Sequence, residues 1–166
     1  MHADQHSWAF HPTDPNKAVI GNDGGIYYAS TLSGANTNIA AISARNKDYN
    51  ITQFYDGAIG QDAGNELLLA GAQDNGTQFV NNASAGVNGS IDVNGGDGAE
   101  SFIDKDGAYM IASYVYNNLT KYDLPYTGTS TSISSEDGDA DPYTGNFINN
   151  GTLDDNLDIL YMNATT

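Results

Sequence analysis

The 166 residues of this chain are enough for one ordinary domain with a core of its own. They include 21 acidic and only 5 basic residues, a formal net charge of −16, which argues against nucleic acid as a partner because phosphate binding needs clustered Lys and Arg. Cysteine is absent, which excludes disulfides and thiolate metal sites, and no apolar run predicts insertion into a membrane.

The first part of the chain predicts strands joined by turns. Residues 2–11 read as a strand, and residues 17–30 read as a hairpin whose turn is Asn22-Asp23-Gly24-Gly25, a run that tolerates positive φ angles. Residues 39–44 are a candidate outer strand. The segment 2–44 therefore has the content of one four-stranded propeller blade.

The same design returns in a second unit, residues 50–93, with a strand at 52–59, a hairpin at 66–80 and an outer strand near 91–93. Asp74 and Gly76 stand in its turn where Asp23 and Gly25 stand in the first. We expect all four to have structural roles, because Asp side chains in turns cap backbone N–H groups and Gly tolerates positive φ.

A third unit covers residues 95–124, followed by a polar loop region at 125–152 and the start of a next unit at 153–166. Units that recur at roughly 45 residues are typical of β-propeller blades. The predicted fold class is all-β, a partial β-propeller of about three antiparallel four-stranded blades. Residues 1–166 are taken as one domain.

Five segments in order carry a family resemblance: residues 2–6, 21–27, 51–55, 71–77 and 95–98. The chain resembles secreted bacterial β-propellers of the sialidase-repeat (BNR, Asp-box) superfamily, sortilin-like and xyloglucanase-like, as in surface proteins of marine Bacteroidota. Leu32 stands where the Asp-box has Asp, and the box Trp is absent, although Ser30 and Gly34 remain. Such propellers have more blades, so the resemblance implies that the remaining blades belong to a larger parent chain.

First strands line the central channel of a propeller, so their polar residues are candidate site residues. His2, Asp4 and His6 alternate and would share one face of a strand, where they could ligate a metal, act in acid–base chemistry or bond to a neighbouring blade. Asp4 and Asp97 are the candidate catalytic pair for glycoside hydrolysis, for which an inverting enzyme needs carboxyl groups about 6.5–9.5 Å apart.

Aromatic residues supply further candidates, because ring faces suit the C–H-rich surfaces of sugars. The predicted ligand-binding residues are His2, His6, Trp8, Gln53 and Tyr55. Other rings that could stack on sugars or instead fill the core between sheets are those of Tyr27, Tyr28, Tyr109, Tyr114 and Tyr116.

An acidic run offers a weak Ca²⁺ candidate. Asp137, Asp139 and Asp141 have the spacing of a Ca²⁺ loop, but Pro142 and Ile148 replace the Gly and Glu of an EF-hand, which excludes that motif. No other cofactor is expected.

The sequence favours a non-catalytic extracellular or cell-surface segment that binds carbohydrate or protein, with its secretion signal outside this chain. The alternative is a polysaccharide-directed glycoside hydrolase with an aspartate acid and base at the channel mouth. A third possibility is self-association through bare blade edges. Aspartates tied to turn backbone and tyrosines between sheets would favour the binding segment, whereas a buried carboxylate pair in a cleft would favour the enzyme.

Overall fold

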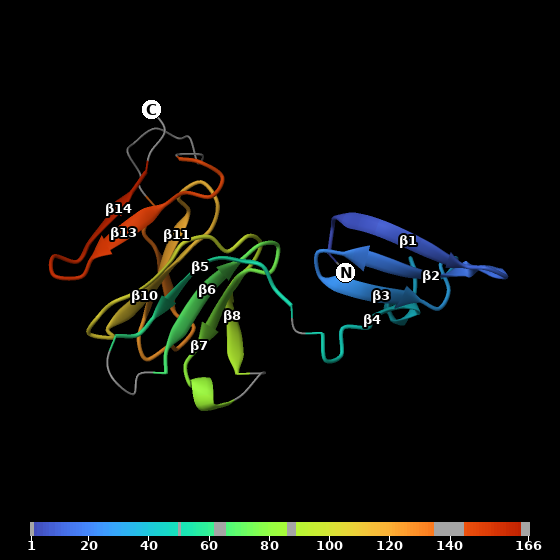
Figure 1. Cartoon of the computed structure of the whole chain (residues 1–166), viewed down its shortest axis with the longest axis horizontal. Helices are drawn as coiled ribbons and strands as arrows, with labels where there is room; N and C mark the ends of the chain where they lie inside the picture. The colour runs from blue at the N-terminus through green and yellow to red at the C-terminus, as the bar shows by residue number, and fades with distance from the viewer. Residues whose placement is uncertain (1, 50, 62–65, 86–88, 135–144, 164–166) are drawn as a thin grey trace. The chain divides into compact units, whose positions relative to one another are not determined.

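The computed structural model describes residues 2–49, 51–61, 66–85, 89–134 and 145–163. Within these ranges the predicted all-β class is confirmed: the strands form four antiparallel sheets, and the helices are two short 3-10 turns, Ile39–Ala41 and Ala83–Ala85 (Figure 1). Neither has the length or apolar character needed to cross a membrane. The chain divides into two compact units, residues 1–51 and 52–166.

The first unit is a single four-stranded meander in which each strand pairs with the next. Its strands are β1 (Gln5–His11), β2 (Asp14–Asn22), β3 (Gly25–Ala29) and β4 (Ile42–Ala44). Ala18, Ile20 and Ala29 are buried on one face, with Leu32 from the loop after β3 packed against them. The β2–β3 turn falls at Asn22–Gly25, where Gly25 has a φ of +101° that favours Gly.

The second unit contains two further four-stranded meanders and a two-stranded sheet. The first meander consists of β5 (Phe54–Ile59), β6 (Leu68–Ala72), β7 (Thr77–Val80) and β8 (Ser90–Asn94). The second consists of β9 (Ser101–Ile103), β10 (Tyr109–Ser113), β11 (Leu119–Asp123) and β12 (Ser130–Ser132). The small sheet pairs β13 (Gly151–Asp154) with β14 (Ile159–Met162).

Two of these elements differ in place from what the sequence predicts. Strand β12 lies inside the segment 125–152, where a polar loop was expected. Its three residues are exposed and show no apolar pattern, so the sequence does not predict that they pair with β11. Strand β13 begins at Gly151, ahead of the expected start at residue 153.

The core of the second unit lies between its two meanders. Leu69 and Phe79 from the β5–β8 sheet pack with Ile103, Met110 and Tyr122 from the β9–β12 sheet, and each is almost fully buried. Alternation along β7, where Thr77 and Phe79 are buried and their neighbours are half-buried, points one face of that strand inward. Burying a side chain such as Leu69 or Phe79 contributes about 1.5–3 kcal/mol, so this contact holds the two sheets together.

Candidate functional site

A solvent-open pocket of about 400 Å³ lies in the second unit, where the end of β8 meets the β10–β11 turn and strand β12. That volume is in the range of small-molecule sites. The lining residues are Asn94, Gly95, Tyr114, Asn118, Leu119, Thr120, Ser132 and Ser134.

Backbone pairing of β11 with β12 and the turn after β10 form the walls of this pocket. Thr120 pairs with Ser132, so both side chains stand on the same face of the sheet. The Ser134 hydroxyl accepts a hydrogen bond from the Leu119 N–H at 3.0 Å. The Tyr114 N–H donates to the Asn118 carbonyl at 2.8 Å, which closes the turn.

The Tyr114 ring is fixed against a glycine. Gly96 has a φ of +75°, and a Cβ atom at this position would lie 2.7 Å from Cε2 of Tyr114. Only Gly therefore lets the ring approach the loop that follows β8. Tyr114 as a whole remains 36% exposed, and it is one of the residues that line the pocket.

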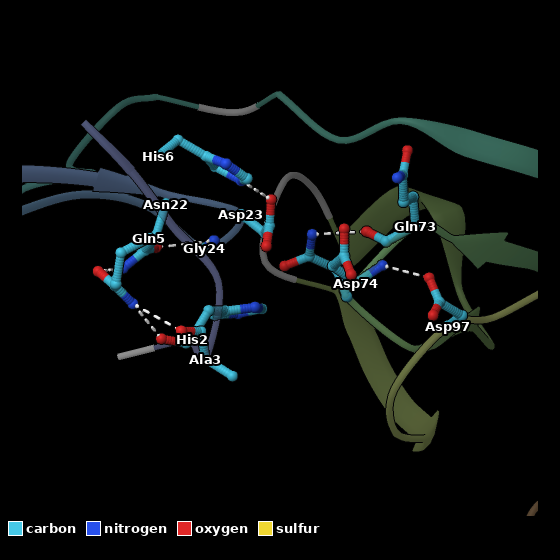
Figure 2. Close-up of polar contacts among 11 residues, drawn as sticks. His2, Ala3, Gln5, His6, Asn22, Asp23, Gly24, Gln73, Asp74 and Asp97 are labelled. Atoms are coloured by element: carbon cyan, nitrogen blue, oxygen red, sulfur yellow. Dashed lines mark hydrogen bonds and ion pairs between the residues drawn. The ribbon is translucent and has the colours of Figure 1, made fainter.

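The predicted aspartate Asp97 lies in the same loop but has a structural partner. Its Oδ1 accepts a hydrogen bond from the Asp74 N–H at 3.0 Å, as Figure 2 shows. Asp74 has a φ of +57° and Gly76 a φ of +70° in the β6–β7 turn. The Gly76 N–H donates to the Gly96 carbonyl at 2.7 Å, so the loop after β8 holds this turn through side chain and backbone.

A corresponding arrangement holds the β2–β3 turn of the first unit. Strand β1 begins at Gln5, so His2 and Asp4 precede it and do not alternate with His6 along a regular strand. The His6 Nε2 contacts Asp23 Oδ1, and the His2 ring lies against Gly24 (Figure 2).

Asn46, which follows β4, completes this arrangement. Its amide donates to the Gly24 carbonyl at 2.6 Å and accepts from the Ile26 N–H at 2.7 Å. The turn is therefore held by His2 ahead of β1, by His6 near the start of β1 and by Asn46 after β4.

Two carboxylates that the sequence analysis did not single out connect the first strands of the second unit. Asp56 on β5 accepts a hydrogen bond from the Ser101 N–H at 2.9 Å, at the start of β9. Burial, and next the charge of Asp56, raise the pKa of Glu100, which a hydrogen bond from the Gly151 N–H at the start of β13 partly offsets. No local motif marks these residues, because their environment comes from separate sheets.

Three other predicted ligand-binding residues, Trp8, Tyr55 and Gln53, lie outside the pocket lining. Trp8 is 45% exposed, and its ring stacks on that of Phe10 with centroids 6.2 Å apart. Burial, and then the charges of Asp97 and Asp74, raise the pKa of Tyr55. Gln53 has an exposed side chain, and its carbonyl accepts from the Gln73 N–H at 2.9 Å.

The structure does not test the predicted Ca²⁺ site or the predicted catalytic pair. Asp137, Asp139 and Asp141 fall outside the described residues. Asp4 belongs to the first unit and Asp97 to the second, so their pairing stays a prediction.

The tyrosines include rings that fill the core between sheets. The Tyr122 and Tyr126 centroids lie 5.7 Å apart, and Tyr126 also contacts Phe79 at 5.6 Å. The Tyr122 hydroxyl donates to the Val93 carbonyl, which gives this buried ring a polar partner on β8.

A scan against protein-family models and a search of the curated proteins both found no match.

Proposed function

We propose that the chain is a non-catalytic binding segment of an extracellular, propeller-type protein, and that its ligand is a carbohydrate held in the pocket beside Tyr114. The observation that carries the proposal is the pocket's chemistry. Its lining combines hydroxyl groups, amides and one half-open aromatic ring. Sugars present hydroxyl groups at their edges and C–H groups on their faces, which suit such a lining.

The fold supports the propeller part of the proposal. Three successive four-stranded meanders, each with neighbouring strands paired in chain order, have the content of propeller blades. The first strands begin at Gln5, Phe54 and Ser101, which is the spacing of a blade repeat. In a larger parent chain, further blades would flank these sheets.

The roles of the aspartates favour binding over catalysis. Asp97 and Asp74 are joined through a turn hydrogen bond, and Asp23 contacts His6 beside a turn. The Asp97 carboxylate thus accepts from a turn N–H and the Asp23 carboxylate contacts a histidine, so both help to hold turns in place.

One observation favours the alternative, a glycoside hydrolase. Burial, and next the charge of Asp56, raise the pKa of Glu100, and two neighbouring carboxyl groups of which one has a raised pKa are the combination that glycoside hydrolysis uses. Glu100 and Asp56 therefore join Asp4 and Asp97 as carboxylates to test.

Binding is tested by isothermal titration calorimetry with cellohexaose, xylohexaose, mannohexaose and laminarihexaose. Tyr114→Ala should weaken binding by about tenfold or more, since removing an aromatic anchor commonly costs over 1 kcal/mol. Tyr161→Ala is the matched control, because Tyr161 is 53% exposed on β14 and does not line the pocket. Absence of binding to every glycan, or equal losses in both variants, would overturn the proposal.

Catalysis is tested on the same glycans by release of reducing ends. The proposal predicts no release by the unmodified chain. Release that disappears in Glu100→Gln and in Asp56→Asn would establish the hydrolase alternative instead.

A further inference from the structure

The residues that line the Tyr114 pocket are all uncharged. We propose that this pocket selects neutral, polyhydroxylated sugars and rejects sugars that carry carboxylate or sulfate groups. The inference rests on the proposed function, since it names the class of carbohydrate that the site takes.

Three lining groups are available to a ligand. Within the described residues, the Asn94 amide, the Thr120 hydroxyl and the Tyr114 hydroxyl form no hydrogen bond to protein. Other lining groups are already engaged: Asn118 donates to the Val115 carbonyl at 2.8 Å, and Ser134 accepts from a backbone N–H. The free groups therefore converge from β8, β11 and the turn after β10.

These groups can both donate hydrogen bonds to sugar hydroxyls and accept hydrogen bonds from them. An amide offers donors and an acceptor, and a hydroxyl offers both, as does each hydroxyl of a sugar. A carboxylate or sulfate only accepts, and it needs a cation to offset the loss of its water. No lining residue supplies one.

Lys121, the basic residue next to Thr120 in the sequence, does not supply a cation to the pocket. Lys121 follows Thr120 on β11, so its side chain leaves the opposite face. Its Nζ lies 3.2 Å from Asp123 Oδ1 and 4.8 Å from the Tyr109 ring centroid. The chain's net charge of −16 adds a general repulsion toward anionic ligands.

The test compares three forms of the glycan that binds best: unmodified, hydroxyethylated and carboxymethylated. The last two add groups of similar size, and only the carboxymethyl group carries charge. We expect the hydroxyethyl form to bind within about threefold of the unmodified glycan and the carboxymethyl form at least tenfold more weakly.

A high salt concentration distinguishes selection by the pocket from repulsion by the net charge of the chain. In 1 M NaCl the Debye length falls to about 3 Å, so general repulsion is screened while unpaired burial of a carboxylate in the pocket is not. Discrimination that persists at this salt concentration supports the proposal. If the difference in affinity between the hydroxyethyl and carboxymethyl forms vanishes, it is caused by the net charge of the chain, and selection by the pocket is overturned.

A gain-of-function variant provides an independent readout. Thr120→Arg places a fixed cation on the pocket face, so it should improve carboxymethyl-glycan binding by about tenfold relative to the hydroxyethyl form. Thr131→Arg is its control on the neighbouring strand β12, at an exposed position outside the lining. Thermal unfolding of each variant verifies that it is folded.

The outcomes for the two proposals differ. Equal, Tyr114-dependent binding of neutral and carboxymethylated glycans would overturn the selection rule and leave the carbohydrate-binding function standing. Failure of all glycans to bind would overturn both. Loss of binding in Thr120→Val and Asn94→Ala, together with persistent discrimination at high salt, is the result that the proposal predicts.

Discussion

Asp97 Oδ1 accepts a hydrogen bond from the backbone N–H of Asp74 at 3.0 Å, which joins the loop after β8 to the β6–β7 turn. Asp74 has a φ of +57°, a conformation that non-glycine residues seldom adopt. The carboxylate therefore stabilises a turn that contains a residue in this seldom-adopted conformation.

Asp97→Ala should destabilise the second unit by about 1–3 kcal/mol, because it removes the hydrogen bond that the half-buried Asp74 N–H donates. Asp97→Asn keeps a carbonyl oxygen at this position and should cost less. Hydrogen exchange of the Asp74 amide and urea unfolding measure the two effects. Asp106→Ala, at an exposed position, is the control; if Asp97→Asn and Asp97→Ala behave alike, the hydrogen bond is not the cause.

Gly98 is a close-contact position between the two meanders. A Cβ there would lie 2.3 Å from the Gly76 carbonyl oxygen and 2.6 Å from Thr77 Oγ1. Gly98→Ala should therefore cost about 1–3 kcal/mol, as overpacking does. Gly95→Ala is the matched control in the same loop, because no atom lies within 4 Å of its added Cβ. Equal unfolding midpoints for the two variants would contradict the predicted clash.

Stability of the second unit should depend on the ionisation of Glu100. Burial and the charge of Asp56 raise its pKa, so folding favours the protonated form. The favourable contribution is complete below the unfolded-state pKa and is lost as the pH rises through the folded-state pKa. Glu100→Gln keeps an acceptor for the Gly151 N–H and removes the charge.

The variant should therefore be more stable than the unmodified chain at pH 7, and this advantage should shrink toward pH 4. Melting temperatures across that range provide the measurement. Parallel profiles for the two proteins would show that Glu100 does not cause the dependence.

The buried Asn149 connects the β10–β11 turn to the end of β14. Its amide donates to Asn117 Oδ1 and to the Asn163 carbonyl, and only 2% of the residue is exposed. Asn149→Ala should cost about 1–3 kcal/mol, because it removes the donor to the buried Asn117 Oδ1, while the Asn163 carbonyl keeps its hydrogen bond from the Asn117 amide. The loss should appear first as faster amide exchange in β13 and β14. Asn150→Ala, at the exposed neighbouring position, should leave exchange unchanged.

Local sequence patterns predict the hairpins better than the sites. The runs at Asn22–Gly25 and Asp74–Gly76 combine turn-forming residues with flanking apolar strands, and both form turns between paired strands. Strand β12 has no such pattern, since Ser130–Ser132 is polar and exposed throughout and is specified by its pairing with β11.

The pocket depends on contacts between segments far apart in the chain, so its residues could not be grouped in advance. Tyr114 was one of several aromatic candidates, and only the approach of Gly96 and the pairing of Thr120 with Ser132 distinguish it. Burial, and next the charge of Asp56 on another sheet, likewise raise the pKa of Glu100. The spacing of residues along the sequence does not predict burial that arises from contacts between separate sheets.

The residues that hold the turns have a consequence for synthesis of the chain. Asn46 and Asp97 each follow the fourth strand of a meander and reach back to the turn between its second and third strands. When a nascent chain has emerged from the ribosome as far as Ala44 or Asn94, it has every strand of a sheet but not yet Asn46 or Asp97. The last of these contacts in each sheet therefore forms only after its fourth strand has emerged, which orders folding from the N-terminus onward.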